Sequence, residues 1–404
     1  MDKILLSAFD CDPSKGSEPG YGWNWASGLA KKGFEVHCLT RVTGKAEIEK
    51  QHIPENLHFH YLTLPFGLEG LFELSVPGQY AYYMTWQWLA YRKAKVLNRR
   101  FNFRLAHHAT WGSAQMGSHM YKLGIPFIFG PVGGGQAAPA AFKKYFLDHW
   151  AAEGKRAKIS SLLLRFNPAC KNMCRKAQTI LVSNPDTYEM LKSIGAKNIE
   201  YSLDASLPEG FYPVQKIIKK TTGGKLNLLW TGSIRPRKGT LLLLDVMKEL
   251  KEYKDIVLTV VGDGEMREEF LEKLKNDQLQ DSVIWKGQVP YNEIKKYYEN
   301  NDVFFMTSLR DSGPSQLIEA MAYGMPVVTL DLHGQGFIVN DQTGIRCNTE
   351  TPEIAIQELK NAILKLAFDP ALVAQMSVAA FEFASHQNWG EKIDTVITKY
   401  YSLS

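Results

Sequence analysis

The stretch that decides the fold is Ser308-Leu-Arg-Asp311-Ser-Gly-Pro-Ser-Gln-Leu-Ile-Glu319-Ala-Met-Ala-Tyr-Gly324-Met-Pro326-Val-Val. Two acids, Asp311 and Glu319, stand eight residues apart, with a turn of small residues and an apolar helical run after the first. The order is strand, loop, helix and strand, which puts Asp311 in a loop above a parallel sheet and Glu319 about a turn and a half into the helix. In such sheets ligands bind beyond the carboxyl ends of the strands. The stretch therefore predicts an α/β fold with both carboxylates near a ligand.

The rest of the chain alternates strands and helices, and the pattern starts a second time near Leu226. Strands are predicted at residues 3–9, 35–40, 57–62, 104–107, 126–129 and 179–183, and then at 226–231, 256–261, 283–286, 303–307 and 327–330. Helical segments between successive strands are typical of doubly wound parallel sheets. We therefore expect two Rossmann-like domains, at residues 1–212 and 226–385, joined by a polar linker at 213–225 and followed by a helix in 386–404.

The acid pair resembles the acid-x7-acid motif of the family-4 retaining glycosyltransferases of the GT-B fold, where this motif grips a sugar nucleotide. The resemblance covers most of the chain and is strongest from Leu226 to Leu330. It implies that Glu319 accepts hydrogen bonds from the ribose hydroxyls, since a carboxylate offers two acceptor oxygens to a diol. It also implies that Asp311, where the family usually has Glu, orients the donor sugar across a cleft between the domains. The last helix would cross back onto the N-terminal, acceptor-side domain.

A basic segment follows the first strand of the second half, Thr231-Gly-Ser-Ile-Arg-Pro-Arg-Lys-Gly239. A diphosphate is bound by fixed cations, backbone N–H groups and helix N-termini. The resemblance assigns this task to an Arg just after the first Gly and a Lys just before the second; Lys238 matches the Lys, and Ser233 replaces the Arg. We expect Arg235 or Arg237 to take its place and to stabilise, with Lys238, the charge of the leaving diphosphate. The alternative is a basic surface loop.

Further donor contacts follow from the same resemblance. Backbone N–H groups of Ser312, Gly313 and Ser315 are expected to meet sugar hydroxyls or phosphate. Gly262 belongs to a Gly-x-Gly turn after the second strand that lacks the third glycine of a dinucleotide fingerprint. Lys286 ends the next strand, where family members hold the base with backbone atoms. No metal-ligand spacing and no Asp-x-Asp pair at a strand end is recognised, so fixed cations are expected instead of a metal, and no cofactor beyond the sugar nucleotide.

In the first half, the family has a glycine-rich loop that approaches the donor phosphates, and Gly16 and Ser17 match its position. The longer form Gly-Ser-Glu-Pro-Gly-x-Gly-Trp resembles a branch of bacterial polysaccharide transferases. Family members often place a histidine at the end of the strand near residue 107, against the donor sugar. We expect His107 to be packed and His108 or Thr110 to reach the cleft, with His108 as a catalytic residue, and a structural histidine is the alternative.

Composition narrows the class of partner. The 404 residues are 45% hydrophobic and 22% charged, with a net charge of +5 and five scattered cysteines. This mild charge suits an anionic small ligand or membrane surface and is too weak to indicate nucleic acid. No apolar run has the length of a signal peptide or a membrane span, and free thiols suit a reducing compartment. We expect a cytoplasmic protein, and attachment to the inner face of the cytoplasmic membrane is left open.

Residues 66–101 do not follow the alternation of strands and helices. Aromatic side chains come first, from Tyr80 to Tyr91, and Arg and Lys residues follow. One hypothesis is that the segment docks on an anionic membrane, with aromatics at the interface and cations on the head groups. The alternative is a buried helix whose aromatics belong to the core.

The resemblance implies a retaining hexosyltransferase that moves a sugar from a UDP or GDP sugar to a hydroxyl of a glycan or lipid-linked glycan in cell-surface polysaccharide synthesis. No carboxylate is assigned as a nucleophile, and retention in the family is usually described as same-face substitution. Two other functions remain open, a non-catalytic nucleotide-sugar or glycan-binding protein and a nucleotide-sugar epimerase of the same fold.

Overall fold

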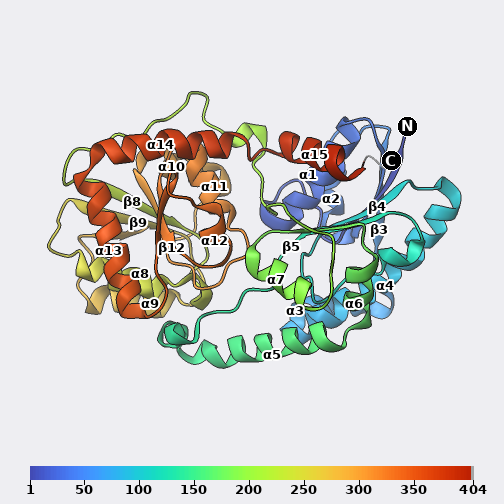
Figure 1. Ribbon diagram of the computed structural model, residues 1–404, viewed down its shortest axis with the longest axis horizontal. Helices are drawn as coiled ribbons and strands as arrows, with labels where there is room; N and C mark the ends of the chain where they lie inside the picture. Colours follow the sequence, from blue (N-terminus) through green and yellow to red (C-terminus); the bar gives the residue numbers. More distant parts are fainter. Residues whose placement is uncertain (402–404) are drawn as a thin grey trace. The chain divides into compact units, whose positions relative to one another are not determined.

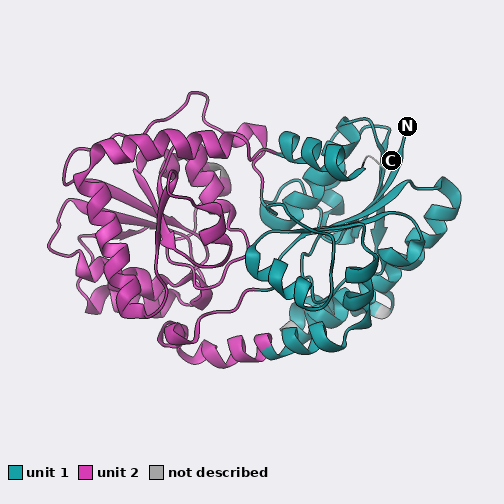
Figure 2. Ribbon diagram, viewed as in Figure 1, with its two compact units in different colours: residues 1–135, 158–205, 389–404 teal, residues 136–157, 206–388 magenta. Residues whose placement is uncertain are grey.

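The computed structural model describes residues 1–401, which form two compact units (Figure 2). Unit 1 comprises residues 1–135, 158–205 and the chain from 389 on, and unit 2 comprises Gln136–Ala157 and Ser206–Asn388. The boundaries differ from the expected ones, because 136–157 and 206–212 belong to unit 2. Phe142, Tyr145 and Phe146 explain the first difference, since they are buried in the same hydrophobic cluster as Trp230 and Ile234.

Unit 1 contains a seven-stranded sheet in the order β3-β2-β1-β4-β5-β6-β7, and every pair of neighbours is parallel. Its strands are β1 Lys3–Ala8, β2 Glu35–Arg41, β3 Leu57–Leu62, β4 Leu105–Thr110, β5 Phe127–Val132, β6 Thr179–Val182 and β7 Ile199–Tyr201. Its helices are α1 Ser17–Lys31, α2 Lys45–Ile48, α3 Leu71–Leu74, α4 Val76–Phe101, α6 Pro168–Lys176, α7 Pro185–Ser193 and α15 Trp389–Val396, while α5, Trp150–Phe166, begins in unit 2. Every residue of β4 and β5 is buried, as is usual when helices cover both faces of a parallel sheet.

Unit 2 contains a six-stranded parallel sheet in the order β10-β9-β8-β11-β12-β13. Its strands are β8 Leu226–Thr231, β9 Ile256–Val261, β10 Val283–Trp285, β11 Val303–Met306, β12 Val327–Leu330 and β13 Gly344–Cys347. The helices that cover its faces (Figure 1) are α8 Thr240–Glu249, α9 Arg267–Asn276, α10 Ile294–Asn300, α11 Ser315–Ala322, α12 His333–Ile338, α13 Pro352–Phe368 and α14 Pro370–Ser385. Both sheets confirm the predicted doubly wound architecture.

The strand order of unit 2 reverses between β8 and β11, which are hydrogen-bonded neighbours although two strands separate them in the chain. Unit 1 reverses in the same way between β1 and β4. At such a switch point the loops after the two strands turn to opposite faces and leave a crevice, which is where α/β sheets bind ligands. In unit 2, these are the loops that carry Lys238 and Asp311.

The end of the chain belongs to the N-terminal unit, as the fold prediction requires. Helix α15 packs on α1, where the Ile393 side chain fills the space that a Cβ on Gly28 would occupy. A turn at Ile397–Tyr401 follows, and the Tyr401 hydroxyl lies 2.7 Å from Nδ1 of the buried His107. These contacts tie the last described residues to the core of unit 1.

Helix α4 contains most of residues 66–101, for which a buried helix and a membrane-docking segment are the two alternatives. Tyr82, Tyr83 and Trp86 are fully buried in the core of unit 1, as the buried-helix alternative predicts. On the opposite face, Met84 and Trp88 are about half exposed, at 49% and 48%. The aromatic run is therefore mainly core, and only part of it faces solvent.

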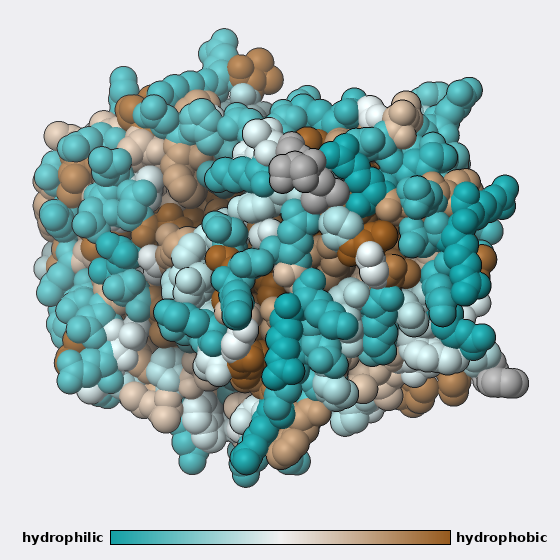
Figure 3. Space-filling model, turned by 45° about the vertical axis from the view of Figure 1, so that its right-hand side comes forward, coloured by the Kyte–Doolittle hydropathy of each residue, from teal (hydrophilic) through white to brown (hydrophobic). Residues whose placement is uncertain are grey.

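The helices and the surface show how the chain relates to membranes and to water. In the described part of the chain, no single helix is long and apolar enough to cross a membrane, and only α13 and α14 together, bent by 101°, reach that length and composition. On the face drawn in Figure 3, hydrophilic residues cover most of the surface and hydrophobic residues form small patches among them.

Candidate functional site

The candidate site of unit 2 is built where the loops after β8 and β11 meet. Gly239 adopts a φ of +63°, and a Cβ on it would lie 2.1 Å from the carbonyl oxygen of Thr307. The Thr307 hydroxyl donates a hydrogen bond of 2.9 Å to the Gly239 carbonyl. Because only glycine permits this approach, the two loops pack backbone against backbone and hold Lys238 beside Asp311.

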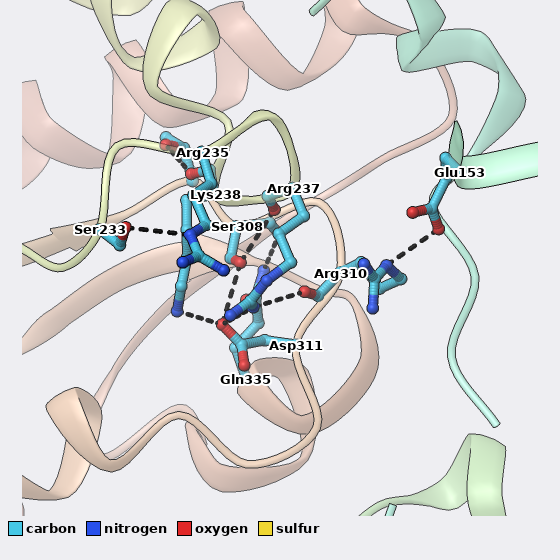
Figure 4. A network of polar contacts seen from close by, with 10 residues as sticks. Glu153, Ser233, Arg235, Arg237, Lys238, Ser308, Arg310, Asp311 and Gln335 are labelled. Atoms are coloured by element: carbon cyan, nitrogen blue, oxygen red, sulfur yellow. Dashed lines mark hydrogen bonds and ion pairs between the residues drawn. The ribbon is translucent and has the colours of Figure 1, made fainter. Parts of the chain in front are cut away.

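Asp311 is the centre of a cluster of polar groups (Figure 4). Its Oδ2 atom pairs with the Lys238 ammonium and lies 3.3 Å from Nη1 of Arg237 and 3.2 Å from the Ser308 hydroxyl. Lys238 is only 6% exposed, so its ammonium is removed from water and held in one position. A fixed cation of this kind stabilises a phosphate oxygen that gains negative charge.

Burial and neighbouring charge set the ionisation of the pair. Burial is the largest influence on Asp311 and would raise its pKa, but the charges of Lys238 and Arg237 outweigh it and lower the pKa of this carboxyl. Burial lowers the pKa of Lys238, and the charge of Asp311 opposes that change. Each charge of the pair therefore favours the ionised form of the other, and burial of both groups opposes it.

The loop after β11 is supported from several elements of unit 2. Gln335 of α12 donates a 2.7 Å hydrogen bond to the Ser308 carbonyl, and Arg237 donates one of 3.2 Å to the Arg310 carbonyl. The Arg310 guanidinium pairs with Glu153, 2.9 Å away, at the start of α5 (Figure 4). These contacts hold the cations in place before a ligand arrives, which lowers the cost of binding one.

Arg235 stands at the exposed edge of the same loop. Its Nε donates a 3.1 Å hydrogen bond to the hydroxyl of Ser233, the residue that replaces the expected arginine. This hydrogen bond holds the guanidinium of Arg235 beside Ser233, on the loop that carries Lys238.

Glu319 is the second buried acid of the site, 7% exposed on the first turns of α11. Tyr298 of α10 donates a 2.8 Å hydrogen bond to its Oε2, and the Tyr298 hydroxyl also lies 3.2 Å from Thr231 at the end of β8. Burial raises the pKa of Glu319, and the Tyr298 and Ser315 hydroxyls and the charge of Lys238 oppose the rise. The charge of Lys238 thus acts on the ionisation of Glu319, and the structure brings both residues to one region of unit 2.

Among the remaining predicted residues of unit 2, some are packed against neighbouring backbone and one is exposed to solvent. Ser312 and Gly313 pack closely against Gly334 of α12. A Cβ added to Gly334 would lie 1.6 Å from the Ser312 carbonyl oxygen, so no larger residue fits there. Gly262 has a φ of +139°, and a Cβ there would be 1.7 Å from the Gly232 carbonyl, so close packing alone explains this glycine. The Lys286 side chain is exposed.

The predicted residues Gly16, Ser17 and His108 belong to unit 1. Gly16 and Ser17 are exposed at the start of α1, and Ser17 has a φ of +56°. The next residue, Glu18, accepts a 2.8 Å hydrogen bond from the backbone N–H of Trp111, so this loop is fastened to the end of β4.

His108 does not reach an open surface of unit 1, contrary to expectation. Its ring is fully buried, with Nδ1 2.9 Å from the Ser7 hydroxyl and Nε2 3.1 Å from the Tyr83 hydroxyl. Burial lowers its pKa to about 3, so the ring is neutral. Because both ring nitrogens are engaged, the structure favours the alternative of a structural histidine, and we leave His108 out of the proposed site.

Sequence reasoning did not find Tyr298, Gln335 or Glu18. Tyr298 and Gln335 lie in the helices before and after the quoted motif, and only the fold shows that they contact Glu319 and Ser308. Glu18 stood inside the quoted glycine-rich loop, and an acid in a loop of glycines was a usable signal.

Comparisons with known proteins support a family for the C-terminal unit. The profile described as "Glycosyl transferases group 1" matches residues 214–383. An uncharacterized glycosyltransferase of Haemophilus influenzae is 28% identical over 173 residues, 42% of this chain and 46% of that protein. The amylovoran biosynthesis glycosyltransferase AmsD of Erwinia amylovora is 31% identical over 137 residues, 34% of this chain and 38% of that protein. The chain thus aligns with less than half the length of these curated relatives.

Among solved structures, the Anabaena protein Alr3699/HepE in complex with UDP superposes with a TM-score of 0.66 at 16% identity, covering 100% of both chains. At this identity the likeness shows the fold, and it extends over both units of the chain.

Proposed function

We propose that this chain, whose residues 214–383 match the family described as glycosyl transferases group 1, transfers a sugar from a nucleoside diphosphate sugar to a hydroxyl of a glycan or lipid-linked glycan. The observation that carries the proposal is the ion cluster of Lys238, Arg237 and Asp311 at the switch point of the unit 2 sheet, with Glu319 in the following helix. A fixed cation and a buried carboxylate on neighbouring elements of one unit match the two ends of a nucleoside diphosphate, its phosphates and its ribose diol.

In this proposal Lys238 binds the diphosphate and stabilises the charge that develops as the sugar leaves. Arg235 and Arg237, on the same loop, neutralise the remaining phosphate charge. Asp311 orients Lys238 and the hydroxyls of the donor sugar, and Glu319 binds the ribose. UDP is the first nucleotide to test, because the Anabaena protein of the same fold was solved with UDP.

The experiment is a thermal-shift titration with UDP, followed by UDP and GDP sugars. A ligand that binds only the folded protein raises the melting temperature. We expect Glu319→Gln to reduce the UDP shift strongly, because a neutral amide offers the diol a single acceptor oxygen. Glu272→Gln, an exposed glutamate of α9, is the matched control and should keep the full shift.

Loss of the shift in both variants, or in neither, would contradict the assignment of Glu319. A shift with UDP but no release of nucleoside diphosphate in the presence of glycan acceptors would favour the binding-protein alternative. Appearance of a second UDP sugar without transfer would favour the epimerase.

We further propose that helix α4 docks on an anionic lipid surface during the reaction with a lipid-linked acceptor. No acidic residue occurs from Val76 to Phe101. Helical spacing places Met84, Trp88, Arg92, Lys95 and Arg99 on one face, and all five side chains are exposed. The Arg92 guanidinium lies over the Trp88 ring, 4.7 Å from its centroid. Apolar side chains among cations are typical of helices that lie at a membrane interface.

Flotation with vesicles tests this surface. The protein should bind phosphatidylglycerol vesicles and bind phosphatidylcholine vesicles weakly. Trp88→Ser should reduce the bound fraction, whereas Phe368→Ser, at an exposed phenylalanine of unit 2, should leave it unchanged. Equal binding by the Trp88 variant and the parent protein would remove α4 from the proposal.

A further inference from the structure

A cluster of histidines lies in unit 1 on the sheet of β2 and β3, away from the loops that follow the strands. Glu35 and His37 alternate on β2, and His58 and His60 alternate on the edge strand β3. The two strands are parallel, with His37 paired to His58 and Leu39 to His60. Because side chains two residues apart in a strand share a face, these four groups lie on one face of the sheet.

The distances within the cluster are short. One ligand atom each from Glu35, His37 and His58 can be chosen so that all three lie within 4.8 Å of one another. His37 Nε2 is 3.2 Å from Glu35 Oε1, and its Nδ1 is 3.0 Å from His60 Nε2. Two ligands on one tetrahedral zinc ion lie about 3.4 Å apart. Of the three, His58 alone has to adjust, and its ring is accessible to solvent at the sheet edge.

We propose that Glu35, His37 and His58 form a binding site for a divalent transition-metal ion, with His60 holding His37 in position. Two imidazoles and a carboxylate suit Zn²⁺, Co²⁺, Ni²⁺ or Cu²⁺, whereas Mg²⁺ and Ca²⁺ prefer oxygen ligands alone. Water would complete the coordination. The site is remote in sequence from the nucleotide-binding motifs and does not depend on the proposed transferase function.

The histidine pair can accept the ion without losing a proton. In the metal-free protein, neutral His60 can donate its Nε2 proton to His37 Nδ1, and His37 can donate its Nε2 proton to Glu35. When the metal binds His37 Nε2, that ring carries its proton on Nδ1 and donates it to His60 Nε2, while the His60 proton moves to Nδ1. Both rings stay neutral throughout. Metal-bound histidines usually donate their other N–H to an acceptor that fixes the ring, and His60 Nε2 would be that acceptor here.

Neighbouring side chains hold His37 and Glu35 in position. The His37 side chain is almost fully buried, so its ring has little freedom to turn away from the other ligands. His37 is fixed between the rings of Phe101 and Phe103, with centroids 4.2 and 5.1 Å away. Lys3 pairs with the other oxygen of Glu35, at 3.2 Å, and orients the carboxylate.

The positive charges of Lys3 and Lys93 near the cluster oppose a bound cation. We therefore expect micromolar affinity rather than the tight binding of a closed structural zinc site. The ligands show no metal-binding spacing along the chain, because they come from two strands whose pairing the sequence does not state.

The test uses the full chain without an affinity tag, after treatment with a chelator and dialysis. Co²⁺ is titrated while its visible absorption is recorded, and Zn²⁺ and Mg²⁺ are added as competitors. We expect one equivalent of Co²⁺ to bind with the absorption of a four- or five-coordinate ion, Zn²⁺ to displace it, and Mg²⁺ to leave it bound.

Variants identify the ligands. His58→Gln and Glu35→Gln should each weaken Co²⁺ binding beyond the roughly tenfold loss expected for the supporting variant His60→Asn. His52→Gln, at an exposed histidine just before β3, is the matched control and should bind as the parent does. His37 is left intact because its ring is part of the packed core. Absence of saturable binding at millimolar Co²⁺, or unchanged affinity in His58→Gln, would overturn the proposal.

Discussion

Replacing Lys238 with methionine removes the buried ammonium of the candidate site while keeping most of the side-chain volume. Loss of one fixed charge that faces a developing oxyanion slows an enzyme about 10²- to 10³-fold. Arg237 remains 3.3 Å from Asp311 and Arg235 stays on the same loop, so part of the phosphate charge is still met. We therefore expect the lower end of the range, a loss of about 100-fold in kcat, or about 2.7 kcal/mol.

The same substitution also affects stability, because it leaves the Asp311 carboxylate without its main partner. Breaking a buried ion pair costs about 3–5 kcal/mol. The Asp311 side chain is 13% exposed and keeps Arg237, so we expect a smaller loss, about 2 kcal/mol. The double variant with Asp311→Asn has neither charge, and it should recover part of this stability while remaining inactive.

The pH dependence of stability shows whether the loss of stability comes from the Lys238–Asp311 ion pair. Because the folded-state pKa of Asp311 is lowered, its ionised form contributes stability at pH values above its unfolded pKa, about 3.9, and this contribution disappears as the pH falls through the folded-state pKa. Without Lys238 the folded-state pKa rises. The stability difference between parent and variant should therefore be largest near pH 7 and shrink below about pH 4.

Donor consumption with a UDP or GDP sugar gives kcat and KM, and denaturant unfolding followed by circular dichroism gives stability. Lys275→Met, at an exposed lysine of α9, is the matched control for loss of a positive charge in unit 2. Parent-like turnover by the Lys238 variant at saturating donor would refute its role at the diphosphate. Recovery of turnover in the double variant would show that the first substitution acted only through misplacement of Asp311.

Two further predictions concern the loops that carry glycines and acids. Burial raises the folded-state pKa of Glu18 to about 7, so ionising this group costs stability as the pH rises from about 4.3 to 7. Glu18→Gln should therefore flatten the fall in melting temperature between pH 5 and pH 8, and an unchanged slope would contradict a buried carboxyl. Gly262→Ala should destabilise the protein by about 1–3 kcal/mol or more, because the φ of +139° and the Gly232 carbonyl leave no room for a Cβ. Gly223→Ala, with nothing within 4 Å of the added Cβ, should stay within about 0.5 kcal/mol of the parent, and similar values for both would refute the packing argument.

Local patterns in the sequence determined the type and order of the elements. The run from Ser308 to Val328 contains its strand, turn and helix in adjacent residues, so its periodicity and its Gly and Pro positions were sufficient to predict them. Helices between successive strands force the strands to be parallel, which brings their carboxyl ends to one edge. For this reason Lys238, Asp311 and Glu319 could be expected together before the structure placed them in one region of unit 2.

Only the tertiary structure decided which strands are neighbours and which side chains reach solvent. The pairing of β8 with β11 brings the loops that carry Lys238 and Asp311 together, and the pairing of β2 with β3 gathers the histidine cluster. Likewise, whether His108 faces a ligand or the core depends on α4, which covers it with Tyr83. Such contacts join residues far apart in the chain, and their free energy comes from packing across the whole sheet, which no local pattern of residues records.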